Sequence, residues 1–334
     1  MMVLRAIVKW YEVGNFRAAK HVPILISTQI VGILPKGSAS SAALCGQQSR
    51  IDSVAAMFHW QYTIRQPPPR LKGLVCPYIS HFQNLGQPVR LLQAPNPNIY
   101  LVIGLGEPCA LKSQAMSENL QSFLVDIKTF PLITEHSGRQ CFILIPLPPW
   151  SGYQIFGGRL LDFTEQVIPL DDIWGRKIDL LMEQLNEQSS WPERFSTLDH
   201  FLMEKFAQAQ YEVRPEIYWA WRQLEATGGR LSIRKMAKEI GWSDRHFSKC
   251  FQQHIGVTPK LAARHIRFYA TLQWLRMAHG DSLSEIAIAG GYSDQSHFTR
   301  EFQSFSGCSP KAYRNAHGAG LAGISGCIVD APQL

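Results

Sequence analysis

Two segments of this chain repeat each other, and they decide the fold of its C-terminal third. Residues 282–311 read SLSEIAIAGGYSDQSHFTREFQSFSGCSPK, and residues 232–260 read SIRKMAKEIGWSDRHFSKCFQQHIGVTPK. The copies match at an offset of 50 residues as far as Asp244 and Asp294, and at 51 after one inserted residue. The shared positions hold serine, alanine, glycine, aspartate, histidine, phenylalanine and proline. An internal repeat of this quality indicates two equivalent structural units.

Each copy has the pattern of a helix, a turn and a second helix. The apolar residues of 233–240 follow the i, i+3, i+4, i+7 spacing of one buried helical face. Gly241 suits the left-handed conformation that ends a helix, and Ser243 suits the N-cap of the next helix. Gly291 and Ser293 are expected to have the same roles in the second copy. Phenylalanines at helical spacing then predict the buried face of each second helix.

One long helix is predicted between the copies, from Pro259 to about Ala278. Thr258 precedes this helix, and a Ser309-Pro310 pair has the same cap-then-proline pattern after the second copy. About 20 residues at 1.5 Å per residue span ~30 Å. Two second helices held about one DNA turn apart, ~34 Å, can enter successive major grooves on one face of a duplex.

The region 224–316 resembles the AraC/XylS-type transcriptional regulators, whose DNA-binding module has two helix-turn-helix subdomains joined by a long helix. The runs Ile286–Phe302 and Ser309–Arg314 carry the resemblance, and Gly290 departs from it where the family often has a cysteine or another small residue. The resemblance implies double-stranded promoter DNA as the partner, with RNA polymerase and a second copy of the chain as further expected partners. It also implies that bases are contacted by the exposed face of each second helix, at Arg245, Ser248, Lys249, Gln295, Ser296, Thr299 and Arg300.

The chemistry of these side chains suits base recognition. Arginine and lysine donate to guanine, glutamine pairs with adenine, and serine and threonine tolerate several bases. The alternative is that the charged residues form a solvated helix face. Structural packing is expected for His246 and His297, which precede core phenylalanines, and for Trp242 and Tyr292.

Charge is distributed unevenly along the chain. The whole chain has a net charge of +7, but residues 225–317 hold thirteen Lys/Arg and seven Asp/Glu, whereas residues 57–224 hold fourteen and sixteen. A basic C-terminal module next to an acidic middle is the balance expected of a module that binds phosphate.

The middle of the chain has the pattern of a β-rich domain. Short β-branched or aromatic runs alternate with turn residues from about 74 to 154, which predicts a sandwich or barrel. Helical spacing begins at Ile173, and residues 189–192 are expected to break that segment into two helices. Residues 93–108 and 163–175 resemble a poorly characterised sensor domain that precedes AraC-type modules. The implied role is binding of a small-molecule effector or dimerisation. Trp150, Tyr153 and Phe156 could line an effector pocket, but core packing is expected for them.

Enzymatic alternatives have little support in the sequence. Seven scattered cysteines without a CxxC pair argue against a disulfide framework or a cysteine zinc site. A cupin-like metal-dependent enzyme would need clustered histidines and a carboxylate, but the middle region offers only His81, Glu135 and His136 without an HxH pair. A DNA-modifying protein that uses the helical module for targeting is the second alternative. We expect no catalytic residues, cofactor or metal.

The resulting layout is an α+β chain with five parts. Residues 1–56 are expected to be an N-terminal extension outside the core, although 22–34 has an outline similar to a signal peptide. Residues 57–210 form the β-rich sandwich or barrel-like sensor domain with trailing helices, 211–224 a linker, 225–317 the all-α double helix-turn-helix domain, and 318–334 a flexible tail. The predicted function is a cytoplasmic, sequence-specific DNA-binding transcriptional regulator that responds to an effector and does not bind membranes, expected as an activator, with repression as the alternative.

Overall fold

The computed structural model describes residues 59–84, 86, 88–113, 116–277, 281–318 and 327–328. The predicted extension at 1–56 and a start at Met57 lie outside this range. The strands are β1 (His59–Arg65), β2 (Tyr78–Asn84), β3 (Val89–Gln93), β4 (Ile99–Gly104), β5 (Cys109–Lys112), β6 (Ser117–Leu120), β7 (Phe123–Val125), β8 (Leu132–His136), β9 (Arg139–Leu147), β10 (Val167–Pro169) and β11 (Cys327–Ile328).

These strands form two antiparallel sheets, as the alternation of short apolar runs and turns predicted. The larger sheet has the order β1-β2-β9-β4-β7-β10, and the smaller has the order β11-β3-β8-β5-β6. The central strand β4 is almost wholly buried and pairs with β9 over six residues, from Ile99 opposite Leu147 to Gly104 opposite Phe142. Its continuous apolar sequence therefore reflects burial on both faces.

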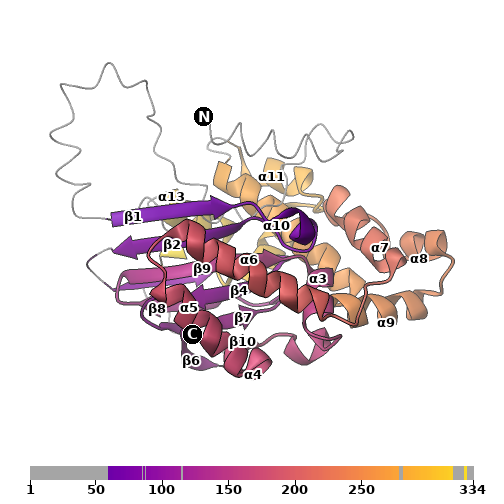
Figure 1. The fold of residues 1–334 in the computed structure, drawn as a ribbon. Coiled ribbons are helices and arrows are strands. Elements are labelled where there is room, and N and C mark those ends of the chain that lie inside the picture. Colours follow the sequence, from indigo (N-terminus) through magenta and orange to yellow (C-terminus); the bar gives the residue numbers. More distant parts are fainter. Residues whose placement is uncertain are drawn as a thin grey trace, which may run out of the picture.

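Helices cover the outer face of the larger sheet. They are α3 (Pro149–Ile155), α4 (Leu170–Trp174), α5 (Arg176–Glu187) and α6 (Trp191–Ala207), with a 3-10 turn, η2 (Leu160–Phe163), between α3 and β10. Figure 1 shows α5 and α6 lying across the strands. The predicted break between them is confirmed, because Ser190 caps α6 in a reciprocal capping box with Glu193. An ion pair of 2.6 Å between Arg65 and Asp199 joins β1 to α6.

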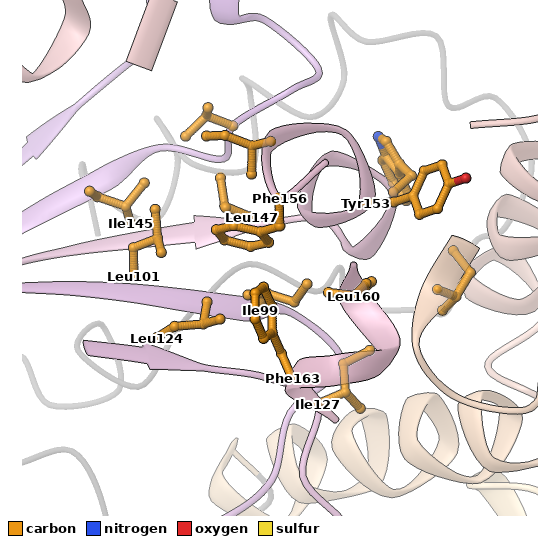
Figure 2. Packing of buried hydrophobic residues seen from close by; sticks show 14 of the residues in the cluster. Ile99, Leu101, Leu124, Ile127, Ile145, Leu147, Tyr153, Phe156, Leu160 and Phe163 are labelled. Carbon is orange, nitrogen blue, oxygen red and sulfur yellow. The ribbon is translucent and has the colours of Figure 1, made fainter. Parts of the chain in front are cut away.

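The main hydrophobic core lies where the larger sheet meets these helices. Figure 2 shows Ile99, Leu147, Phe156 and Phe163 packed between the strands and the turns that follow them. The rings of Phe156 and Phe163 meet edge to face with centroids 5.4 Å apart. Core packing is also observed for Trp150, as expected for the aromatic residues of this segment.

The C-terminal helices form a second layer that is continuous with this core. They are α7 (Pro215–Ala226), α8 (Ile233–Ile240), α9 (Asp244–Ile255), α10 (Pro259–Met277), α11 (Leu283–Ala289), α12 (Gln295–Ser306) and α13 (Pro310–Gly318). The main cluster extends from the sheet through Trp221 to Phe247 and Phe251 on the first helix pair. A second cluster joins α10–α13 to Leu92 and Ile133 of the smaller sheet. The chain is therefore α+β, with a β-rich domain followed by an all-α module.

The predicted linker at 211–224 is wrong for most of its length. Residues 215–226 form α7, in which Ile217, Ala220, Trp221 and Leu224 are buried at i, i+3, i+4, i+7 spacing. The sequence carried this signal, and burial of one apolar face is what makes the segment helical. Helix α7 belongs to the core of the all-α module, which therefore starts before residue 225.

The predicted flexible tail also needs correction. Within 318–334, residues 327–328 form β11, which pairs antiparallel with Leu91 and Leu92 of β3. Backbone hydrogen bonds to an open sheet edge fix these two residues, although their sequence has no strand pattern. No helix in the described part of the chain is long and apolar enough to cross a membrane.

Candidate nucleic-acid interface

The first helix-turn-helix is formed by α8 and α9. Helix α8 ends at Gly241, which has the predicted left-handed conformation at φ 82°. Ser243 caps α9 as predicted, because its hydroxyl oxygen accepts the backbone N–H of His246 at 3.2 Å. Phe247 and Phe251 are fully buried and fix the inner face of α9. The opposite face of α9 is consequently turned to solvent.

The second helix-turn-helix, α11 and α12, differs from the first at its turn. Gly291 takes φ 82° as expected, but Asp294 rather than Ser293 is the N-cap of α12. The Asp294 carboxylate accepts the N–H of His297 at 2.7 Å, and this hydrogen bond holds the pKa of Asp294 below its usual value. The inserted residue of the second copy moves the helix start by one position, so the cap moves from serine to aspartate. The offset of 51 therefore applies to the whole of both second helices.

All seven predicted DNA-contacting residues lie on the outward faces of these two helices. Five are exposed, and Ser248 and Thr299 are half-buried. None of the three basic residues among them forms an ion pair with another described residue. At the offset of 51, three pairs occupy equivalent places: Arg245 and Ser296, Ser248 and Thr299, and Lys249 and Arg300. The structure thus brings these side chains onto two matching polar faces.

The structure adds one further pair to this surface. Gln252 and Gln303 are exposed and lie one turn beyond the predicted positions on α9 and α12. They are identical at the offset of 51, which is the signal that could have identified them from sequence. A glutamine amide can make a bidentate pair with adenine.

The neighbouring aromatic and histidine residues take several roles. Tyr292 is buried, as expected for packing between helices. Trp242 is half-buried and meets the His246 ring edge to face at 4.7 Å. His246 is exposed, but its ring packs against Trp242, which agrees with the structural packing expected for it. His297 is half-buried and contacts the Tyr292 ring at 5.3 Å.

Helix α10 sets the separation of the two motifs. Its nineteen residues, Pro259–Met277, agree with the predicted linking helix and span ~28 Å. Glu301 of α12 ties this helix to the second motif, because it pairs with Arg264 at 2.8 Å and with Arg267 at 3.6 Å. Arg230, in the loop before α8, donates to the Ala289 carbonyl of α11 at 3.3 Å. These contacts fix the motifs relative to each other.

Both second helices end against the β-rich domain. Gly256, which ends α9, accepts a hydrogen bond of 3.1 Å from the Thr164 hydroxyl through its carbonyl oxygen. Gly307, which ends α12, lies against Pro131 in the loop before β8. The N-terminal halves of α9 and α12, which carry the matching polar faces, therefore lie at the ends remote from these contacts.

Comparison with known families assigns this region. Residues 236–316 match the family model described as a helix-turn-helix domain. This region is an AraC-type double helix-turn-helix module. An uncharacterised HTH-type transcriptional regulator of Staphylococcus aureus (strain COL) is 29% identical over 92 residues, which are 25% of this chain and 11% of that protein. One from Haemophilus influenzae is 30% identical over 84 residues, 25% of this chain and 28% of that protein.

The chain therefore spans about a tenth to somewhat over a quarter of the length of these relatives. Among solved structures, ToxT from Vibrio cholerae is 10% identical with a TM-score of 0.42, covering 78% of this chain and 98% of that one. The C-terminal domain of AraT, a response regulator from Geobacillus stearothermophilus, is 22% identical with a TM-score of 0.30, covering 31% of this chain and 88% of that domain.

A second candidate site precedes the AraC-type module. A cavity of about 170 Å³ lies between the two sheets and is lined by residues of β2–β5 and β7–β9. It does not involve Trp150, Tyr153 or Phe156. No three His, Cys, Asp or Glu side chains come together as a metal site within the part of the chain that the structure describes. The cavity thus offers hydrogen bonds and apolar contacts.

The β3–β8 pair separates this cavity from the AraC-type module. Leu91, Leu132 and Thr134 line the cavity. Leu92 and Ile133, which are paired across the two strands, are buried in the apolar cluster of α10–α13. Alternate residues of a strand point to opposite faces. A single layer of backbone therefore carries the cavity wall on one face and the packing of the second motif on the other.

Proposed function

We propose that this protein is a sequence-specific DNA-binding transcriptional regulator that responds to a small molecule. The observation that carries the proposal is the pair of matching polar faces on α9 and α12, held in fixed relation by α10. Phosphate contacts from the basic module supply affinity, and the two faces supply sequence preference. The half-sites lie ~10 bp apart, because α10 sets the spacing.

Lys249 and Arg300 occupy equivalent places but have different chemistry. Arginine presents a rigid fork that pairs with guanine through two hydrogen bonds, whereas lysine acts as a point charge. Arg300 accordingly distinguishes bases, and Lys249 mainly holds phosphate. Arg245, Ser248, Gln295, Ser296 and Thr299 complete the proposed reading surface.

Binding selections on randomised duplexes with the full-length chain test this proposal. Arg300→Ala should lose ~1–3 kcal/mol of discrimination at one position of its half-site. Lys249→Ala should weaken binding to all DNA sequences more evenly. It should also reduce the slope of log affinity against log salt concentration by about one. Arg139→Ala removes an exposed arginine from the β-rich domain and is the matched control, which should change neither quantity. If both module variants keep the wild-type preference and salt slope, these faces do not read DNA.

The response to a small molecule is supported by the shared wall. A molecule in the cavity contacts Leu91 of β3 and Leu132 of β8. Any displacement of these strands also moves Leu92 and Ile133, which pack against the helices of the second motif. Packed cores resist continuous deformation, so a small shift is passed to the helices rather than absorbed.

The remaining partners belong to the same proposal. We expect the protein to bind promoter DNA in the cytoplasm, to activate transcription and to catalyse no reaction. RNA polymerase is a further expected partner. Where the operator has two sites, the protein is expected to bind as a homodimer. Transcription in a purified system, with and without the Arg300→Ala variant, tests the activating role. The mass of the DNA-bound complex gives the number of copies.

A further inference from the structure

The cavity between the two sheets offers room for a small molecule inside the β-rich domain. Its walls are largely apolar, and they come from both sheets at Leu91, Val102, Phe123, Val125, Leu132 and Leu144. Amide groups interrupt this surface at Gln83, Gln93, Gln121 and Gln140. Apolar walls with a few fixed polar groups are typical of sites for small organic molecules.

No lysine or arginine is found among the described residues that line the cavity. His81 and His136 are both buried and joined through the Gln83 amide, at 2.9 Å and 3.3 Å. Burial lowers the pKa of His81 to about 4 and lowers that of His136, so both rings are neutral at neutral pH. The interior walls therefore carry no positive charge that could pair with an anion.

One carboxylate is also part of the lining, but it is open to solvent. Glu107 is exposed to solvent and accepts a hydrogen bond of 2.6 Å from the Ser137 hydroxyl. A solvated carboxylate contributes little to pairing with a cation. Transfer of an unpaired charge of either sign into the apolar part of the cavity would be costly.

We propose that this cavity binds an uncharged molecule with a compact apolar body and one or two hydrogen-bonding groups, and that it excludes carboxylates. The inference rests on the proposed function, for which this molecule is the effector. The volume of about 170 Å³ sets its size. Because a dry apolar cavity of ~150 Å³ holds benzene, the ligand has a body of about one ring. Its polar group is held by the amides.

Three probes that share one phenyl body test the charge preference. They are 2-phenylethanol, phenylacetate and the 2-phenylethylammonium ion, and their binding to the full-length chain is measured by titration calorimetry. We expect one equivalent of 2-phenylethanol to bind, and phenylacetate and the ammonium ion to bind at least about ten-fold more weakly, since each must bury an unpaired charge. Replacing Val102 by the larger phenylalanine, V102F, should abolish binding of the alcohol by filling the cavity.

A variant with a new charge tests the reason for the preference. Gln93→Lys places a cation on the cavity wall and should strengthen phenylacetate binding by about ten-fold or more, because the anion then has a partner. Gln184→Lys makes the same change on the exposed face of α5 and should leave the order of the three probes unchanged. Gln93→Lys is informative only if it folds, but the wild-type ranking and V102F test the proposal without it.

Three outcomes would overturn the proposal. They are phenylacetate binding as tightly as 2-phenylethanol, no detectable binding of 2-phenylethanol, and full binding of the alcohol by V102F. Each is measured without DNA, so it leaves the proposed DNA binding intact. Failure of the full-length chain to select any duplex would overturn the proposed function instead, while the probe titrations would still report on the cavity.

Discussion

His265 in the middle of α10 should make the protein sensitive to acid. Its side chain is fully buried, and neither ring nitrogen has a hydrogen-bond partner within the part of the chain that is described. The Phe305 ring meets it edge to face at 4.8 Å. Burial and, to a smaller extent, the nearby Arg264 guanidinium lower the pKa of His265 to about 3. The imidazole is therefore neutral in the folded protein and protonates readily once it is exposed.

The sign and size of the effect follow from this difference in pKa. The unfolded chain binds the proton at its ordinary pKa of about 6.5, whereas the folded protein does not bind it until about pH 3. The contribution of His265 to the free energy of unfolding is fully present when the pH lies above its pKa in the unfolded chain. It is lost as the pH falls toward its pKa in the folded protein. Between about pH 7 and about pH 4.5 the loss is about 2.7 kcal/mol, two pKa units at 1.36 kcal/mol each.

Thermal unfolding of wild type and His265→Leu at these two pH values measures this loss. Leucine keeps an apolar side chain against Phe305 and does not titrate. The other buried histidines are common to both proteins, so their contributions cancel in the comparison. The melting midpoint of the wild type should fall by about 5–10 °C more than that of the variant on acidification, at the ~2–4 °C per kcal/mol known for proteins of about 150–250 residues. Equal losses in the two proteins would refute the reasoning.

Two further predictions concern the loop before β8 and the shared wall. Asp126 is buried, and burial raises its pKa to about 7, so stability falls as the pH rises from about 4 to about 7. Asp126→Asn does not titrate and should therefore gain about 1–3 kcal/mol over wild type between about pH 5 and pH 8 in urea unfolding, and a constant difference would contradict this. Ile133→Ala should cost about 2–5 kcal/mol in stability and reduce the change in DNA affinity that 2-phenylethanol causes, whereas Ile143→Ala, in the other sheet, should cost as much but retain that change.

The all-α module could be predicted closely because its signals are local. Caps, glycine turns and helical spacing are properties of neighbouring residues, and the repeat shows each of them twice. The one error at the turn, Ser293 in place of Asp294 as the cap, came from assigning the inserted residue to the wrong side of the helix start. Base-contact roles for the exposed side chains remain predictions, whereas their placement on two outward faces follows from the buried phenylalanines of α9 and α12.

The strands of the β-rich domain were predicted where their sequences are apolar runs. Strand β6 (Ser117–Leu120) is largely exposed, and β10 has three residues, so neither has a pattern that stands out from a loop. Their pairing depends on partners far away in the sequence, such as Val167 opposite Val125. The cavity is not a local property either, because its lining comes from two sheets whose relative position the sequence does not state.

The contacts between the β-rich domain and the AraC-type module provide the route by which a molecule in the cavity would act on the proposed DNA-contacting faces. Each second helix is anchored to the β-rich domain at its C-terminal end, through Gly256 against Thr164 and Gly307 against Pro131. Pro131 directly precedes β8, whose Leu132 lines the cavity. Displacement of β8 by a bound molecule would therefore reach α12 both at its end and along its buried face, whereas α9 is anchored to a turn outside the cavity wall. We therefore expect the DNA contacts of the second motif, rather than those of the first, to depend on the occupant of the cavity.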